Sequence, residues 1–245
     1  MKLNNRTIVL TGPSSGVGLD LLKQLATHNR VIGLSRRRPP DEAIEALTHY
    51  THITLDLAEA DSVAEAIATI RGSHPDGIDG LINCGAVQFT ARFVDEHFEP
   101  ESIAREIAIN LASPAQLIAG LIDPLSRTPS PFIMNINSGL GLVPKHESAI
   151  YCATKAALDN LTRGLRPQLK AKGIAVQQAF LPLVDTPMTE GRGSGKLTSG
   201  DVAAQIIRAI ETRTLDTDIG KVKLLRSIQR LSPSLAHRIM QKGDA

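Results

Sequence analysis

The sequence predicts an α/β fold, a single doubly wound domain with a central parallel sheet flanked by helices on both faces. Three observations support this prediction. Short runs rich in Val, Ile and Leu alternate with longer helical patterns from end to end of the chain. The short runs are apolar on both faces, which is typical of strands in a parallel sheet that is covered on both sides. The first of them leads directly into a glycine-rich turn and then into a helical pattern.

The elements follow one another in strict alternation, which makes neighbouring strands parallel. The expected strands are Thr7 to Leu10, Val31 to Leu34, Ile53 to Leu55, Gly80 to Asn83, Phe132 to Ile136 and Ile174 to Phe180. The expected helices are Val17 to His28, Asp41 to Thr48, Ser62 to Arg71, Ser102 to Leu125 and Ala149 to Lys172. No repeat, low-complexity tract or Pro/Ser-rich linker divides the chain, so we expect one domain over residues 1–245.

Composition excludes several classes of function. With 245 residues, 42% of them hydrophobic, the chain is long enough to bury a sizeable core. A formal net charge of +2 gives no reason to expect a polyanionic partner. Five Phe, two Tyr and no Trp leave little for stacking on bases. We therefore expect no nucleic-acid partner.

Cysteine use and hydropathy bear on the compartment. Cys84 and Cys152 form neither a Cys-x-x-Cys motif nor a metal-ligand cluster, so we expect reduced thiols and no metal site. Residues Met1 to Arg6 are polar, and the apolar stretch that follows them is too short for a signal-peptide core. No uninterrupted apolar run approaches the length of a membrane span. These observations predict a soluble, cytoplasmic protein without stable membrane insertion.

The turn after the first strand has the composition of a phosphate cradle. Its candidate ligand-binding residues are Gly12, Ser14, Ser15, Gly16, Val17 and Gly18. Glycines let the backbone approach a pyrophosphate, and the free N–H groups at the helix start supply donors and a partial positive charge. No Lys follows the last glycine, which excludes a P-loop. A purely structural turn is the alternative, but the position between the first strand and a helix favours a dinucleotide and a Rossmann-type domain.

The end of the second expected strand indicates which dinucleotide. An acidic residue there would bind the ribose 2′-hydroxyl of NAD, whereas arginine would bind the 2′-phosphate of NADP. The chain instead has Arg36, Arg37 and Arg38, with no Asp or Glu before Asp41. A solvated loop would also explain three consecutive arginines. Their position favours NADP(H) over NAD(H), with Arg36 and Arg37 as candidate contacts.

A tyrosine and a lysine in the second half have the spacing of a catalytic pair. Tyr151 and Lys155 are four residues apart, so on a helix they share one face. The Lys155 ammonium would then lower the pKa of the Tyr151 phenol from about 10 towards the operating range. Such a phenol can donate a proton to a carbonyl that receives hydride, or remove one in the reverse reaction. Ser138, at the end of an expected strand, could bind the same carbonyl oxygen.

Taken together, these motifs resemble the short-chain dehydrogenase/reductase family, and the resemblance extends from Thr7 to about Met188. It implies that Tyr151 is the general acid/base, that Lys155 also holds the nicotinamide ribose, and that Ser138 positions the substrate carbonyl. It implies that Asn110 helps to maintain a proton relay. Further cofactor contacts that it implies are Asp56, Leu57, Asn83, Cys84, Gly85, Pro182, Val184 and Thr186.

Some of these residues also have ordinary structural explanations. Asn110 fits a satisfied polar residue of a helix, Asp56 a helix cap, and Thr186 a turn residue before a proline. Cys152 has no supporting His and Asp pattern, so we expect a packed small residue rather than a nucleophile. The chain departs from the family where Leu183 replaces the glycine usual after Pro182, which leaves the shape of that wall open.

Two late segments break the regular alternation. A glycine-rich stretch from Gly191 to Gly195 indicates a mobile substrate loop near 186–200, with an ordinary surface connection as the alternative. The extension 220–245 mixes basic and apolar residues. For it we expect a helix that packs its apolar face on the domain, and the alternative is a segment bound to a membrane surface.

The sequence thus predicts an NADP(H)-dependent oxidoreductase that interconverts a carbonyl and a secondary alcohol of a small molecule, in a modestly apolar pocket near Val143, Leu183 and Met188. A catalytically idle NADP-binding sensor or regulatory protein of the same fold is the main alternative. A structural or membrane-associated partner protein is a second one. The family resemblance also implies a homodimer or homotetramer, commonly built from the two long helices.

Overall fold

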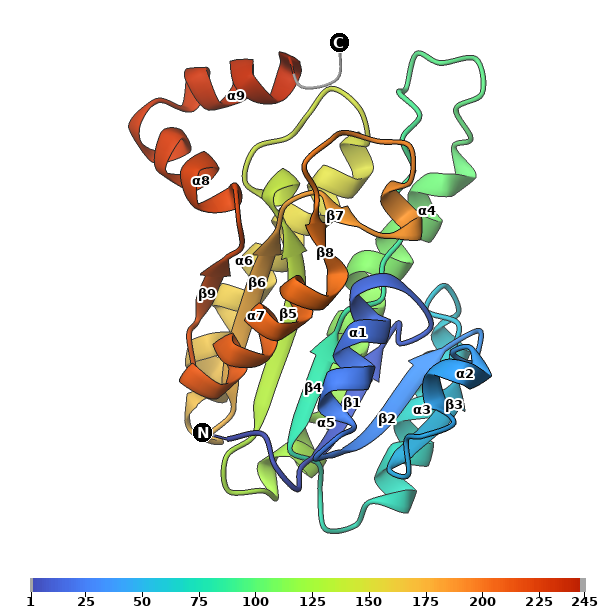
Figure 1. Cartoon of the computed structure of the whole chain (residues 1–245). Helices are drawn as coiled ribbons and strands as arrows, with labels where there is room; N and C mark the ends of the chain where they lie inside the picture. Colours follow the sequence, from blue (N-terminus) through green and yellow to red (C-terminus); the bar gives the residue numbers. More distant parts are fainter. Residues whose placement is uncertain (1, 243–245) are drawn as a thin grey trace.

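A seven-stranded parallel sheet forms the centre of the computed structural model, which describes residues 2–242 (Figure 1). The strand order is β3-β2-β1-β4-β5-β6-β9. Because the order reverses between β1 and β4, a crevice opens there at the carboxyl ends of the strands. The predicted doubly wound α/β fold is confirmed. The strands are β1 (Thr7–Thr11), β2 (Arg30–Ser35), β3 (Tyr50–Thr54), β4 (Gly80–Asn83), β5 (Phe132–Ser138), β6 (Ala175–Leu181) and β9 (Asp216–Asp218).

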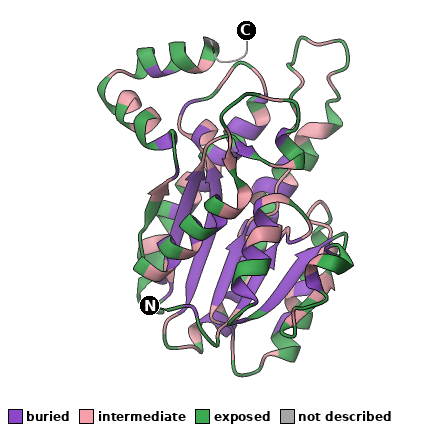
Figure 2. Cartoon of the chain, in the orientation of Figure 1, coloured by how far each residue is buried: buried purple, intermediate pink, exposed green. Residues whose placement is uncertain are grey.

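Helices cover both faces of the sheet and enclose two apolar cores (Figures 1 and 2). On one face lie α1 (Gly16–Leu25) and α7 (Ser199–Thr212). On the other lie α3 (Ala60–Ser73), α5 (Ser113–Ser126) and α6 (Ala149–Lys170). The remaining elements are α2 (Asp41–Ile44), α4 (Glu101–Ile107), α8 (Val222–Leu231), α9 (Pro233–Lys242), the short helices η1 (Ala108–Ala112), η2 (Gly139–Gly141) and η3 (Pro187–Thr189), and the strand pair β7 (Val184–Asp185) and β8 (Leu197–Thr198).

The helix expected over Ser102 to Leu125 is a composite of α4, the π-helical turn η1 and α5. Among the described residues it is the one helix with the length and apolar composition to cross a membrane. Its residues Leu117 and Leu121 are fully buried in the core that α5 shares with α3 and the sheet. It is therefore a core helix, and the π-turn places Asn110 at its centre.

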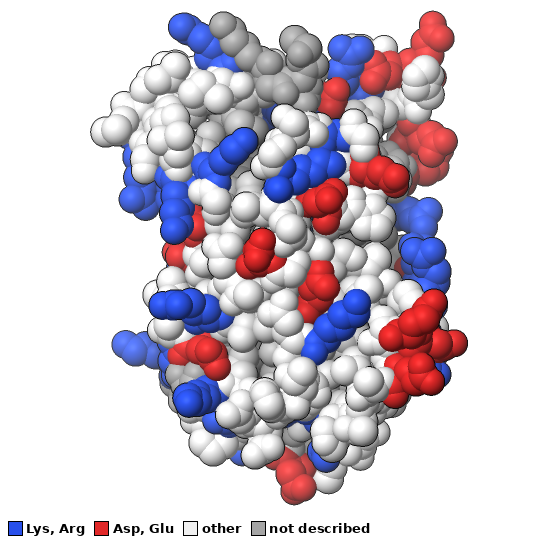
Figure 3. Space-filling model, viewed as in Figure 1, with Lys and Arg blue, Asp and Glu red and all other residues white. Residues whose placement is uncertain are grey.

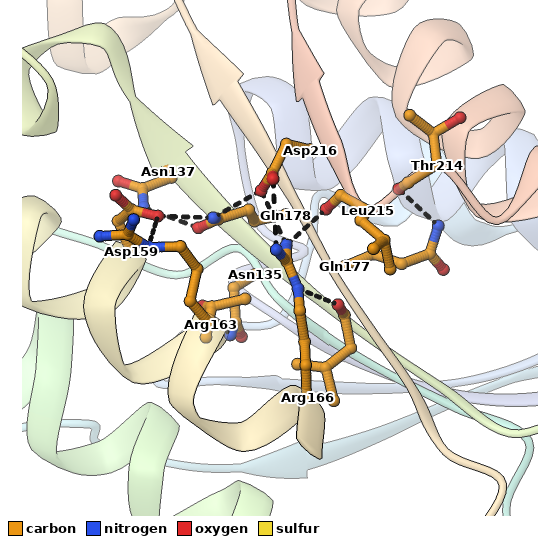
Figure 4. A network of polar contacts seen from close by, with 12 residues as sticks. Asn135, Asn137, Asp159, Arg163, Arg166, Gln177, Gln178, Thr214, Leu215 and Asp216 are labelled. Carbon is orange, nitrogen blue, oxygen red and sulfur yellow. Dashed lines mark hydrogen bonds and ion pairs between the residues drawn. The ribbon is translucent and has the colours of Figure 1, made fainter. Parts of the chain in front are cut away.

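A buried polar network fastens α6 to the far edge of the sheet (Figure 4). Gln178 of β6 is fully buried, and its Nε2 donates to Oδ1 of Asp159 in α6 and to Oδ1 of Asp216 in β9, each at 2.7 Å. Arg166 of α6 donates to the same Asp216 oxygen at 2.7 Å. Buried polar groups stabilise a fold only when they are bonded, and these bonds fix where α6 lies.

Several element bounds differ from those expected. The strand expected at Ile53 to Leu55 is β3, which begins at Tyr50 because the polar residues at its start pair with β2. The helix α2 ends at Ile44 rather than Thr48. Neither α7 nor β9 was expected, and β9 has only three residues, two of them acidic.

The C-terminal extension forms two helices instead of one. The chain bends at Ser232 and α9 starts with Pro233, which has no N–H to continue α8. Val222 is buried next to Gly139 of η2 and Ala236 of α9 is also buried, but Leu224 and Leu231 are exposed. The expected packing of the apolar face is thus found only in part. Residues 243–245 of that extension, and Met1, lie outside the described residues.

Candidate active site

A cleft of about 880 Å³ lies at the carboxyl ends of the strands, where the strand order reverses. It brings together most of the residues that the sequence singles out. Those that line it are Gly12, Ser14, Ser15, Gly16, Val17, Gly18, Arg36, Arg37, Asp56, Leu57, Cys84, Gly85, Ser138, Tyr151, Lys155, Pro182, Val184 and Thr186. Two predicted site residues, Asn83 and Asn110, are not among the described lining residues.

Two positions around the turn between β1 and α1, Gly12 and Gly18, have no room for a side chain. Gly12 has φ +71°, and a Cβ there would lie 2.8 Å from Cα of Gly85. A Cβ on Gly18 would lie 2.0 Å from the Gly12 carbonyl oxygen. The N–H groups of Cys84 and Gly85 both donate to Oγ1 of Thr11 at 2.9 Å, which joins this turn to the end of β4. The close packing leaves a concave backbone at the start of α1, which fits a pyrophosphate.

The basic end of β2 faces the same cleft. Arg36 and Arg37 are exposed lining residues, whereas Arg38 is not among the described residues that line the cleft. Nη1 of Arg36 lies 4.0 Å from Oδ2 of Asp56. Oδ1 of Asp56 also accepts from the Ala58 N–H at 2.9 Å, so this carboxylate closes a turn as well as lining the cleft. This edge has the charge that a 2′-phosphate requires.

Ser138, Tyr151 and Lys155 meet at the other end of the cleft. Ser138 is the last residue of β5, and its Oγ accepts from the Leu140 N–H at 3.1 Å. Tyr151 and Lys155 lie one turn apart near the start of α6. The Lys155 Nζ lies 5.6 Å from the centroid of the Tyr151 ring and donates to the Ile136 carbonyl oxygen at 2.9 Å. The predicted sharing of a helix face by these two residues is therefore found.

Burial controls the titration of this pair. It raises the pKa of Tyr151 to about 12, although the hydrogen bond with Ser138 and the positive charge of Arg192 act in the opposite direction. Burial also lowers the pKa of Lys155 to about 8. The net shift of the Tyr151 pKa is therefore upward, opposite to the lowering expected from Lys155, because desolvation of the phenol is the largest cause. The phenol is protonated at neutral pH.

Both asparagines outside the cleft lining hold elements in place. Asn110, in the π-turn η1, accepts from the Val87 N–H at 2.9 Å and donates to the Val87 carbonyl at 2.8 Å. It also donates to Oγ1 of Thr154 on α6 at 3.3 Å. The Asn83 side chain is buried in the sheet and donates to Oδ1 of Asn135 at 2.8 Å. The structure does not bring the Asn83 side chain, expected as a cofactor contact, into the cleft.

Of the three residues expected to form a modestly apolar pocket, two line the cleft. Leu183 and Met188 line the cleft, but Val143 is fully buried and is not among the described lining residues. Thr186 forms a capping box with Thr189 at η3 and also lines the cleft, so its structural and site interpretations both fit.

Cys84 and Cys152 are free thiols, and burial raises the pKa of each, which argues against a nucleophilic role.

Three features of the site escaped the sequence analysis. Glu106 is buried one turn before Asn110, accepts from the Phe89 N–H at 3.1 Å, and has its pKa raised by burial to about 7. Arg192 lines the cleft from within the glycine-rich stretch. The helices α8 and α9 also contribute apolar lining residues, Leu224, Leu225, Ile228, Ile239 and Met240. The glycines around Arg192 were the one available signal, because they indicate a loop near a ligand.

Comparisons with known proteins agree with this geometry. The family profile described as short chain dehydrogenase matches residues 6–196. The chain is 32% identical to the Bacillus subtilis oxidoreductase DltE over 193 residues, which cover 78% of this chain and 76% of that protein. It is 31% identical to a D-beta-hydroxybutyrate dehydrogenase of Rhizobium meliloti, over 76% of this chain and 74% of that protein. A Burkholderia cenocepacia short chain dehydrogenase solved in complex with NADP superimposes with a TM-score of 0.87 at 20% identity, covering 98% of this chain and 99% of its own.

Proposed function

The chain belongs to the short-chain dehydrogenase/reductase family of oxidoreductases that act on CH–OH groups, and on this premise we propose that it interconverts a carbonyl and a secondary alcohol with NADP(H). The observation that carries the proposal is that Ser138, Tyr151 and Lys155 line the same cleft as the glycine turn. A protein that only sensed the dinucleotide would need the turn but not these three side chains. Their joint presence favours catalysis over the sensor.

Arg36 and Arg37 are the basis for proposing NADP(H) rather than NAD(H). Both side chains line the cleft beyond the end of β2, where the dinucleotide's adenosine ribose lies in this type of fold. An arginine guanidinium binds a phosphate with two parallel hydrogen bonds. The Burkholderia cenocepacia relative was solved with NADP, which supports the same choice here.

The nicotinamide cofactor, when bound, supplies or accepts the hydride. The chain's own residues handle the carbonyl oxygen and its proton. The Tyr151 phenol, protonated because burial raises its pKa to about 12, donates its proton to the carbonyl oxygen during reduction. The Ser138 hydroxyl donates a second hydrogen bond to that oxygen and stabilises the charge that develops on it. Lys155 carries its positive charge next to the phenol, where it stabilises the phenolate left behind.

Asn110 is proposed as a positioning residue. Its amide bonds to both backbone groups of Val87, which follows the cleft residues Cys84, Gly85 and Ala86. The third bond, to Thr154, reaches the helix turn that separates Tyr151 from Lys155. Asn110 thereby keeps the chain after β4 and the catalytic helix in register, and the proton relay expected from the family would pass beside it.

The test is NADPH oxidation, followed at 340 nm, across a panel of ketones, aldehydes and β-ketoacyl thioesters. We expect turnover in the wild type and none above background in Tyr151→Phe, while NADPH affinity measured by fluorescence stays unchanged. Near wild-type turnover in Tyr151→Phe would overturn the acid/base role. Tight NADPH binding without turnover of any carbonyl would instead favour the sensor.

Assembly and compartment complete the proposal. We expect a homodimer or homotetramer in which the α4–η1–α5 helix and α6 form the interface, as in relatives of this family. Light scattering coupled to size-exclusion chromatography distinguishes these states from a monomer. We also propose that one domain spans residues 1–245, with its loop at 186–200 closing over the substrate, and that the protein works in the cytoplasm.

A further inference from the structure

Arg192 is placed beside the catalytic helix by a relay of hydrogen bonds. Its Nη1 donates to Oε1 of Gln88 at 3.1 Å, and Nε2 of Gln88 donates to Oγ of Ser148 at 3.0 Å. Ser148 directly precedes α6, three residues before Tyr151. Nη2 of Arg192 donates to the Met188 carbonyl oxygen. These contacts join the glycine-rich loop to the start of α6 and hold the guanidinium at the substrate end of the cleft.

No acidic residue of the described chain neutralises the charge of Arg192. No Asp or Glu of the described chain forms an ion pair with it, whereas Lys145, on the same cleft wall, lies 3.1 Å from Oε2 of Glu147. A guanidinium has five donors, and the contacts with Gln88 and Met188 use two of them. Arg192 and Tyr151 line the same cleft, and the positive charge of Arg192 acts to lower the pKa of the phenol. A half-buried, unpaired cation of this kind suits an anionic ligand.

Apolar, exposed side chains line the same cleft, and two of them lie close to Arg192: its Nη2 donates to the Met188 carbonyl oxygen, and Leu183 packs at the neighbouring Gly193. Leu183, Met188, Leu224 and Ile239 all line the cleft, and each is between 40% and 65% exposed. Leu224 and Ile239 come from α8 and α9, which extend over this end of the sheet (Figure 1). Figure 3 shows a largely uncharged surface where these helices lie, bordered by Lys and Arg. Large apolar side chains that remain exposed around one cleft mark a binding surface for an apolar group.

From this unpaired cation and these apolar side chains in one cleft we infer that the substrate is an alkyl oxo acid or the corresponding hydroxy acid, with its carboxylate bound by Arg192 and its alkyl chain against α8 and α9. This inference rests on the proposed function, since it places the reacting carbonyl at Ser138 and Tyr151, which line the same cleft. A thioester cofactor would also bring negative charge, but its phosphates lie many bonds from the reacting carbonyl. Arg192 and Tyr151 line the same cleft, and Arg192 is held to the residue that precedes α6 through Gln88, which favours a carboxylate close to that carbonyl.

Binding of an unreactive analogue tests the inference without requiring turnover. Decanoate and decanol are titrated calorimetrically into the wild-type protein in the presence of NADPH, with which decanol cannot be oxidised. We expect decanoate to bind at least about 10-fold more tightly than decanol, because only the acid forms charge-assisted bonds. In Arg192→Gln, decanoate affinity falls by about the same factor and decanol affinity does not change. Lys221→Gln is the matched control, since Lys221 is an exposed cation that also lines the cleft, just before α8.

Each outcome decides the question. Equal decanoate affinity in the wild type and Arg192→Gln overturns the inference, as does a wild type that does not prefer the acid. Equal losses in Arg192→Gln and Lys221→Gln would also overturn it, because they would indicate general attraction by the cleft. Failure of the proposed function is seen separately, as absence of NADPH oxidation with every carbonyl compound, and leaves the binding result valid. Thermal melting and NADPH affinity show that each variant is folded.

Discussion

The ammonium of Lys155 donates to the carbonyl oxygen of Ile136 at 2.9 Å, which joins α6 to the end of β5. Ser138 follows Ile136 by two residues, and Tyr151 precedes Lys155 by one helical turn. One hydrogen bond thus connects the two elements whose side chains are proposed to bind the same carbonyl oxygen. Because the ammonium is buried, its desolvation is compensated only by such local partners.

Replacing Lys155 therefore removes both a positive charge and the hydrogen bond that joins α6 to β5. We expect Lys155→Met to lower the rate of carbonyl reduction by about 10²-fold or more, the scale of acid–base catalysis. Steady-state NADPH oxidation measures the effect. The matched variant Lys170→Met changes an exposed lysine at the end of the same helix and should keep the wild-type rate. Loss in both variants would indicate damage to α6 rather than to catalysis.

The pH profile should carry the signature of Lys155. Burial lowers its pKa to about 8, so the ammonium loses its proton as the pH rises past that value. Tyr151 stays protonated over the same range because its pKa is raised to about 12. We expect the reduction rate to fall above about pH 8 in the wild type and this inflection to be absent in Lys155→Met. A wild-type rate that is constant from pH 7 to 10 would contradict the assignment.

Burial of Glu106 predicts that the stability of the protein, rather than its activity, depends on pH. Burial raises its pKa from 4.5 to about 7, so the folded chain keeps this proton where the unfolded chain has lost it. Stability from the neutral carboxyl is therefore complete below pH 4.5 and is lost as the pH rises to 7. Urea unfolding should show Glu106→Gln more stable than wild type at pH 8 but not at pH 4.5. The exposed Glu101→Gln is the control, and equal shifts in both variants would refute the prediction.

Two arginines are expected to select the cofactor. In Arg36→Ala/Arg37→Ala, NADPH affinity should fall at least about 10-fold, the scale of a lost hydrogen bond to a charged group, while NADH affinity changes little. Fluorescence titration measures both. Arg38→Ala is a matched control from the same run, because Arg38 is not among the described lining residues. Equal losses for NADPH and NADH would mean that these arginines do not bind the 2′-phosphate.

Two glycines, Gly18 after the β1 turn and Gly164 in α6, give opposite predictions for substitution by alanine. A Cβ on Gly18 would lie 2.0 Å from the Gly12 carbonyl oxygen, so Gly18→Ala should lower the free energy of unfolding by about 1–3 kcal/mol and weaken NADPH binding. Gly164 lies in α6 with nothing within 4 Å of its Cβ position. Gly164→Ala should therefore raise stability by about 0.5–1 kcal/mol. Denaturant unfolding compares the two, and destabilisation by both would contradict the packing argument.

The predictable parts of the molecule are those that a short stretch of sequence determines. Apolar runs mark the central strands, and the glycine turn needs only its own residues and their position after β1. By contrast, β9 has the sequence Asp216-Thr217-Asp218 and is held by Arg166 and Gln178, which are distant in the chain. No local pattern encodes such a strand, because its stabilisation comes from tertiary contacts.

In the site, too, some features follow from local sequence patterns and others depend on tertiary contacts. Tyr151 and Lys155 are found by their spacing together with the other family motifs, whereas the direction of the Tyr151 pKa shift depends on burial, which a sequence pattern does not reveal. Asn83 was expected at the cofactor, but its side chain points into the sheet towards Asn135. Arg192 becomes prominent only when the loop fold brings it to Gln88, 104 residues earlier in the chain.

The central claim is that this cleft transfers hydride from NADPH to a carbonyl with Tyr151 as the proton donor. The most direct measurement uses NADPH deuterated at the transferring position of the nicotinamide, with mass spectrometry of the alcohol formed by wild type and Tyr151→Phe. We predict an alcohol that carries the deuterium on the former carbonyl carbon in the wild type, and none above background in the variant. Equal amounts of labelled alcohol from both proteins, or unlabelled alcohol from the wild type, would contradict the claim.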